Sequence, residues 1–184
     1  MEFLDLFVIF FFSYYIYISG KILGKFISKK SQIFFFENFL VGISTITVFI
    51  NFAYFILNFS IENSLLIFSI IIFLIFLKLN EFKIKFFLEK EILFFFLMIS
   101  IFFLPAIIYG EQFYIFRGNH YDGTWYIGNA VIIKNFIYSE FLNPSNEILI
   151  ELISSLDKSL YERPGAALFL SIFLLFSKNI FLVN

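Results

Sequence analysis

Long apolar runs alternate with short polar segments along the chain. A helix needs about 20 apolar residues to cross roughly 30 Å of hydrocarbon, at about 1.5 Å per residue. The runs that meet this length lie at about Phe3–Leu23, Phe34–Asn58, Ile61–Leu79 and Ile92–Tyr109, and a further run begins near Ala166. The pattern therefore predicts an all-α, polytopic transmembrane helical protein with about five spans.

Lysines set the expected orientation of these spans. Eight of the 13 basic residues follow the first and third runs: Lys21, Lys25, Lys29, Lys30, Lys78, Lys83, Lys85 and Lys90. Loops rich in Lys and Arg stay on the cytoplasmic side. The amino terminus, the turn at Asn58–Asn63 and residues 110–165 are then expected to lie outside.

Residues 110–165 differ from the rest in their pattern. Apolar positions recur at helical spacing in Thr124–Tyr138 and again in Pro144–Leu160, but neither stretch is apolar enough to span. Both fit amphipathic helices that lie in the membrane interface. We therefore expect a four-span region (1–109), an external loop with two interfacial helices and a candidate active site (110–165), and the start of a further transmembrane helix (166–184).

Composition narrows the functional classes. Hydrophobic residues make up 61% of the chain, charged residues 15%, and the mean hydropathy is +0.93. A soluble domain has about 25% charged residues, so a soluble enzyme, a disordered tail and a nucleic-acid binder with a basic face are excluded. The chain has no cysteine, which excludes disulfides, zinc–cysteine sites, iron–sulfur clusters and thiol catalysis.

The external loop concentrates the residues that can carry chemistry. It holds the only His, His120, close to Asp122, and it ends with Glu162 and Arg163. A carboxylate can accept a proton from an acceptor hydroxyl. An arginine can bind a phosphate through two parallel hydrogen bonds. A lipid-phosphate sugar donor would present its phosphate at this depth.

This loop resembles the first outer loop of the GT-C membrane glycosyltransferases, in the ArnT-like and protein mannosyltransferase-like branch. There an Asp opens an interfacial helix with a Tyr four residues on, which matches Asp122 and Tyr126, and the loop closes with an aromatic–acid–base–proline run, which matches 161–164. The chain departs from that branch at Gly123, where a second acid often stands. Members of the branch have many more spans, so we expect an amino-terminal fragment of a longer protein.

The resemblance implies an integral membrane glycosyltransferase of the bacterial inner membrane. It would move a sugar from a polyprenyl-phosphate donor to an acceptor on the outer face, with membrane lipid and the lipid-linked donor as partners. Asp122 would be catalytic, and the substrate-binding residues would be Arg163, His120, Tyr126 and Glu162. No nucleic acid and no cofactor are expected.

Other interpretations of the same residues remain open. Asp122 is also a favoured N-cap residue, and Arg163 before a span can be a snorkelling side chain. His120 and Asp122 resemble two metal ligands, but a zinc site needs at least a third protein ligand, so we expect none.

Two other functional classes remain open as well. One is another polyprenyl-linked glycan protein, similar to an O-antigen polymerase or ligase; its outer loop is usually late in the chain and Arg-rich, whereas this chain has two Arg. The other is a non-enzymatic multi-span membrane protein.

Overall fold

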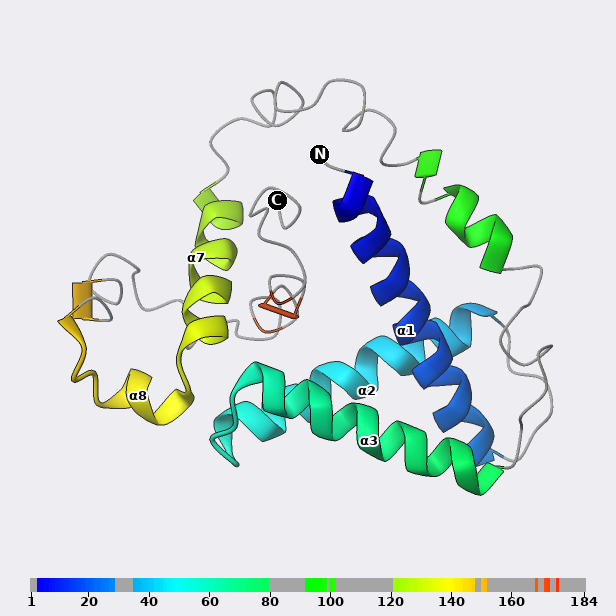
Figure 1. Cartoon of the computed structure of the whole chain (residues 1–184), viewed down its shortest axis with the longest axis horizontal. Coiled ribbons are helices and arrows are strands. Elements are labelled where there is room, and N and C mark those ends of the chain that lie inside the picture. The colour runs from blue at the N-terminus through cyan, green and yellow to red at the C-terminus, as the bar shows by residue number, and fades with distance from the viewer. Residues whose placement is uncertain are drawn as a thin grey trace. The chain divides into compact units, whose positions relative to one another are not determined.

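The described part of the chain consists of helices joined by short turns (Figure 1). The computed structural model describes residues 3–28, 35–79, 92–98, 100–101, 121–147, 150–151, 168, 171–172 and 175. Its labelled helices are α1 (Phe3–Ser28), α2 (Phe35–Phe55), α3 (Ile61–Leu79), α7 (Tyr121–Asn135) and α8 (Tyr138–Leu142). The all-α prediction is confirmed over these residues.

Three helices are long and apolar enough to cross a membrane. Their membrane-crossing portions are Phe7–Ile27 in α1, Phe36–Phe55 in α2 and Ile61–Leu79 in α3. They coincide with the first three predicted spans, and three such helices indicate a membrane protein. Residues 92–98, 100–101, 168, 171–172 and 175 are also helical, but the rest of the predicted fourth and fifth spans lies outside the described residues.

The first helix is longer at its carboxyl end than the apolar run suggested. Lys21 and Lys25, predicted to follow the first span, are part of α1, which continues to Ser28. Lys21 is only 7% exposed, and its Nζ lies 5.8 Å from the centroid of the Tyr17 ring. The long aliphatic stem of lysine packs along apolar surface, and a cation is favourable over an aromatic face, so the helix need not end there.

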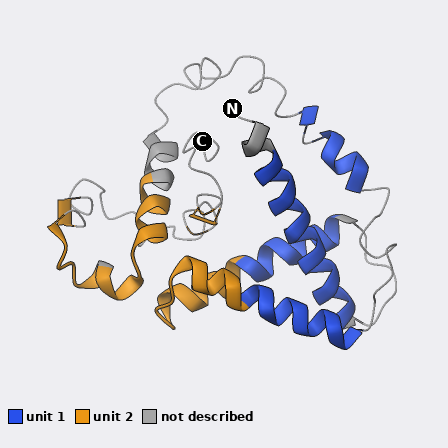
Figure 2. Cartoon of the chain, in the orientation of Figure 1, with its two compact units in different colours: residues 1–46, 68–116 blue, residues 47–67, 117–184 orange. Residues whose placement is uncertain are grey.

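The chain divides into two compact units (Figure 2). Unit 1 consists of residues 1–46 and 68–116, and unit 2 of residues 47–67 and 117–184. Helices α2 and α3 each contribute residues to both units, and unit 2 contains the turn that joins them.

In unit 1, α1 and α2 cross with their backbones in contact. A Cβ atom on Gly20 would lie 2.6 Å from the backbone nitrogen of Gly42 and closer still to the carbonyl oxygen of Asn38. A Cβ atom on Gly42 would in turn overlap the carbonyl group of Ile16. Only glycine permits this approach, and small residues serve the same purpose in many membrane helix pairs.

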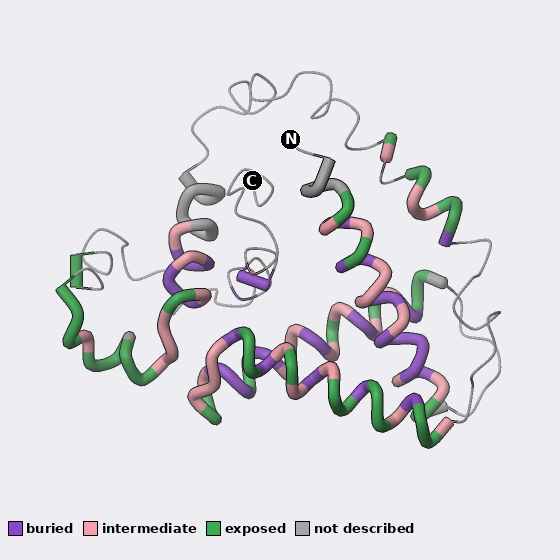
Figure 3. The backbone as a smooth tube through the Cα atoms, in the orientation of Figure 1, coloured by how far each residue is buried: buried purple, intermediate pink, exposed green. Residues whose placement is uncertain are grey.

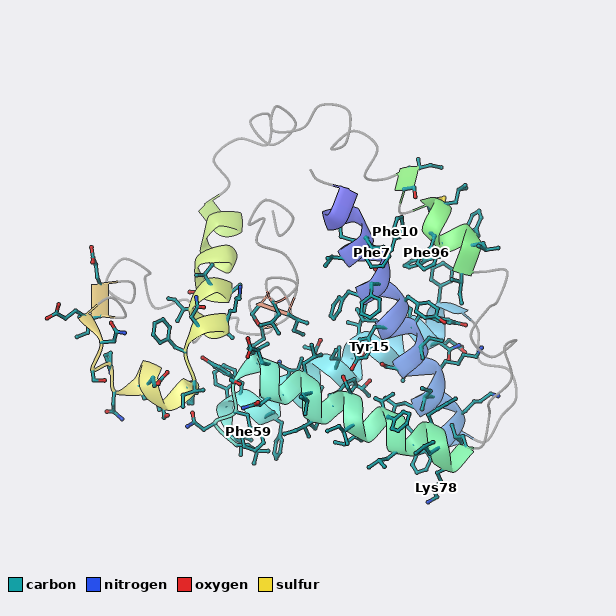
Figure 4. All side chains as sticks on the ribbon, viewed as in Figure 1. Phe7, Phe10, Tyr15, Phe59, Lys78 and Phe96 are labelled. Carbon is teal, nitrogen blue, oxygen red and sulfur yellow. The ribbon has the colours of Figure 1, made fainter. Side chains whose placement is uncertain are left out.

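Aromatic packing joins residues 92–98 to the same unit. The rings of Phe10 and Phe96 are 5.1 Å apart and meet edge to face (Figure 4), and Phe39 and Phe95 are 5.2 Å apart. Tyr15 of α1 also forms a 2.8 Å hydrogen bond with the Ser69 hydroxyl of α3. The two ring pairs show that the start of the predicted fourth span packs against α1 and α2.

Burial along α3 follows the helical period (Figure 3). The buried positions Phe68, Ile72 and Phe76 recur every four residues on one face, whereas Leu66 and Leu74 are more than half exposed. Large apolar side chains on the exposed side are expected where a helix faces lipid tails, because lipid is as apolar as leucine. The burial pattern therefore fits a helix with one side in the protein and one in the bilayer.

Candidate functional site

Helix α7 carries two of the predicted site residues. It extends over Tyr121–Asn135, compared with the predicted Thr124–Tyr138. Asp122 lies in its first turn and Tyr126 four residues later, so both residues belong to one side of the helix. An acid in the first turn is favourable because the amino-terminal end of a helix carries partial positive charge.

The other predicted site residues lie outside the described residues. His120, Glu162 and Arg163 belong to this group, and so does most of the second predicted interfacial helix, of which residues 147 and 150–151 are described as helical. The side chains of Asp122 and Tyr126 are likewise outside the described part.

The carboxyl-terminal half of α7 buries one side, which includes the polar Asn129 as well as apolar residues. Ala130, Ile132 and Ile133 are at most 1% exposed. Asn135 on the opposite side is exposed, and its amide Nδ2 donates a 2.9 Å hydrogen bond to the carbonyl oxygen of Val131. This half of the helix therefore packs its apolar face into unit 2.

The end of α7 is held by a tyrosine of α2. Tyr54 is fully buried, and its hydroxyl donates a 3.0 Å hydrogen bond to the carbonyl oxygen of Phe136. The rings of Tyr54, Phe55 and Tyr138 also pack together, with centroid distances of 4.8 to 6.0 Å. A tyrosine suits this position because its ring packs among apolar groups while its hydroxyl satisfies a carbonyl that has left the helix.

An asparagine of the α2–α3 turn holds the start of α8. Asn58 Nδ2 donates a 2.7 Å hydrogen bond to Ser139 Oγ, and its Oδ1 accepts a 2.7 Å bond from the Ser139 backbone N–H. The first N–H groups of a helix lack partners within the helix, so Asn58 caps α8 from a segment 81 residues away. Asn58 has φ 57°, a left-handed conformation that asparagine tolerates better than most residues.

The side chain of Glu140 completes the cap of α8. Glu140 Oε2 accepts a 3.1 Å hydrogen bond from the backbone N–H of Ile137, the residue that precedes the helix. We call Tyr54 and Asn58, with their partners Phe136 and Ser139, the Tyr54–Asn58 clamp. The clamp holds the short loop between α7 and α8 by hydrogen bonds to its backbone.

The clamp places α8 and the end of α7 beside the turn between two membrane-crossing helices. Such a turn emerges at one surface of the membrane, since the helices on either side of it cross in opposite directions. The hydrogen bonds thus join this turn to Phe136 and Ser139. That the 58–63 turn and residues 110–165 share one side of the membrane stays a prediction.

Charge in the described part of unit 2 is mainly negative. Its exposed carboxylates are Glu62, Glu140, Glu147 and Glu151, and its one described lysine side chain is the half-buried Lys134. Carboxylates repel an anionic phosphate group.

Sequence reasoning did not identify Tyr54, Asn58 and Ser139. Asn58 was assigned to the end of an apolar run and to the turn that follows it, without a partner. A left-handed turn is a recognised role for asparagine between two helices. No local pattern, however, relates position 58 to position 139, so the pairing could not be read from spacing.

No protein-family model, no curated protein and no solved structure matches this chain. Its function therefore has to be argued from its own residues and contacts.

Proposed function

We propose that this membrane protein is a GT-C-like glycosyltransferase, or the amino-terminal part of one. It transfers a sugar from a polyprenyl-phosphate donor to an acceptor on the outer face of the bacterial inner membrane. The observation that carries the proposal is the Tyr54–Asn58 clamp. It fastens the helix that contains Asp122 and Tyr126 to the turn between two membrane-crossing helices.

The clamp matters because of where such a reaction has to occur. A polyprenyl-phosphate donor keeps its chain in the bilayer and its phosphate at the lipid–water boundary. Helix α7 has 15 residues and is therefore about 22 Å long at about 1.5 Å per residue. With its carboxyl-terminal end fixed at the surface, a helix that lies along the membrane keeps Asp122 at the depth of the donor phosphate.

Each residue then has a chemical role. Asp122 accepts the proton of the acceptor hydroxyl while that oxygen bonds to the anomeric carbon and the bond from this carbon to the phosphate oxygen breaks. The polyprenyl phosphate leaves with the bonding electrons, and Arg163 binds it bidentately. His120, Tyr126 and Glu162 bind the sugar and the acceptor. None of these roles requires a metal.

Replacing Asp122 tests the proposal. Asp122→Asn keeps the size of the side chain in the first turn of α7 but cannot take up the proton, so transfer in vesicles supplied with a lipid-phosphate sugar should fall about 10²–10⁴-fold. Glu147→Gln makes the same chemical change at an exposed carboxylate and should leave transfer unchanged. The assay uses the complete polypeptide, because the resemblance is to proteins with more spans.

The result separates catalysis from a purely structural role. Because α7 begins at Tyr121, Asp122 is not its N-cap residue, and the structural alternative is a favourable charge in the first turn. That role predicts near-normal transfer by Asp122→Asn, with a stability change of roughly 1 kcal/mol or less. Such a result would remove Asp122 from the mechanism. Loss of transfer in both Asp122→Asn and Glu147→Gln would also refute the assignment. Transfer would then be lost on removal of a carboxylate at either position, so the effect would not be specific to Asp122.

A further inference from the structure

Helix α2 carries a stripe of polar side chains in the middle of its membrane-crossing portion. Ser44, Thr47 and Asn51 are spaced three and four residues apart, which places them on one side of the helix. Thr47 is about 16 Å from the Phe36 end of the crossing portion and about 12 Å from the Phe55 end, at about 1.5 Å per residue. The stripe therefore lies deep in the hydrocarbon region.

This stripe is accessible in the described structure. Ser44 is exposed, Thr47 and Asn51 are half-exposed, and the neighbouring side chains of Val48 and Phe52 are 68% and 47% exposed. Among the described residues, no helix packs over these positions.

The hydrogen bonds of the stripe are incomplete. Asn51 Nδ2 donates one 2.8 Å bond to the carbonyl oxygen of Thr47, and within the described part of the chain its second N–H and its Oδ1 form no further bond. The neighbouring Thr45 is different, because its hydroxyl bonds to the carbonyl oxygens of Val41 and Gly42 on its own helix. The Thr47 hydroxyl forms no hydrogen bond to any described residue.

Lipid cannot satisfy these groups, because the bilayer core contains no water to bond with them. Asn, Ser and Thr side chains in membrane helices typically form hydrogen bonds to another helix. Three hydroxyls on the other described spans bond elsewhere: Ser69 to Tyr15, Ser64 to the Ser60 carbonyl, and Ser100 to the Phe96 carbonyl. Ser19 of α1 is only 1% exposed, so it lies inside the protein and not on the exposed side of α2 that carries the stripe.

We propose that α2 pairs with α2 of a second copy of this chain through Thr47 and Asn51. A carboxamide has both donors and an acceptor, so it is complementary to itself. Across a two-fold axis, one Asn51 donates to the Asn51 of the other copy and accepts from it in return. The exposed Val48 and Phe52 pack around this pair and exclude lipid from it. The pairing does not depend on the proposed transferase activity.

The absence of native cysteine allows a direct test by cross-linking in membranes. Val48→Cys and Phe52→Cys, each as the only cysteine of the full chain, should yield disulfide-linked dimers under mild oxidation. The control is Leu66→Cys on α3, which is 58% exposed and should remain monomeric. A disulfide requires Cβ atoms about 3.5–4.5 Å apart. Random collisions between copies in the bilayer should therefore give little cross-linked dimer, and equally little at every exposed position.

The polar contribution is tested in the Val48→Cys background. Asn51→Leu should weaken dimer formation about tenfold, and Asn51→Gln should restore part of it. Thr47→Val should weaken it by a smaller factor, whereas Thr45→Val removes a hydroxyl that bonds within its own helix and should have no effect. The restoring variant shows that the loss is not a folding defect.

Three results would overturn the pairing. One is equal cross-linking at Val48→Cys and Leu66→Cys. Another is unchanged dimer formation in Asn51→Leu. The third is no dimer at Val48→Cys together with protection of that cysteine from maleimide reagents, which would assign the stripe to a different helix.

Discussion

The α1–α2 crossing in unit 1 and the Tyr54–Asn58 clamp in unit 2 join helices by opposite means. At the crossing, Gly20 and Gly42 remove side chains so that two backbones touch. At the clamp, Tyr54 and Asn58 add side chains that bond to backbone groups of a distant loop. The crossing depends on the absence of atoms, while the clamp depends on directional bonds.

The two contacts should respond differently to substitution. Backbone atoms at the crossing cannot move aside for a new side chain, so even a small addition should disrupt it. The clamp consists of separate hydrogen bonds, each of which typically contributes about 1 kcal/mol. Its outer bonds are near solvent, where water can replace a lost partner.

The largest effect is expected for Gly20→Leu. The added side chain would occupy the space of the Asn38 and Gly42 backbones, so the α1–α2 crossing should be destabilised by about 3 kcal/mol or more. Reversible unfolding in mixed micelles, followed by circular dichroism, measures this change. Leu74→Phe enlarges a side chain that is 57% exposed on α3 and should change stability little. Equal stability of Gly20→Leu and the wild type would mean that the backbones are not in contact.

A smaller effect is expected for Tyr54→Phe. The ring packing is kept, but the partly buried Phe136 carbonyl loses its donor, which should cost about 1–2 kcal/mol in the stability of the α7–α8 loop. Amide hydrogen exchange of residues 136–140 should accelerate accordingly. Tyr138→Phe makes the same change in a ring of the same cluster and should have less effect. If the two variants exchange equally, the Tyr54 hydroxyl does not hold the loop.

The smallest effect is expected at the Asn58–Ser139 pair. Asn58→Gly removes both hydrogen bonds but accepts the positive φ, so it should destabilise the loop by about 1 kcal/mol. Asn58→Ala should cost more, because alanine is also strained at that φ. Ser139→Ala removes one exposed hydrogen bond and should cost about 0.5 kcal/mol. Hydrogen exchange at residues 136–140 ranks the three variants by the stability of the loop. If Asn58→Gly destabilised the loop more than Asn58→Ala, the positive φ of Asn58 would not contribute to the effect.

The sequence alone predicted the elements whose signals are local. Apolar runs of sufficient length predicted α1, α2 and α3, because crossing hydrocarbon requires consecutive apolar residues. Helical spacing of Ala130 and Ile133 predicted the buried face of α7, since side chains three or four residues apart share one side of a helix. Asp122 and Tyr126 were placed on one helix for the same reason.

Contacts between distant segments were decided only by the tertiary structure. Gly20 and Gly42 are unremarkable in a membrane helix until their backbones are seen to touch. Asn58 lies 81 residues from Ser139, and neither residue has a local pattern that marks the other as its partner. Hydrogen bonds and close packing depend on distances in space, whereas a sequence pattern reports only which side of its own helix a residue occupies.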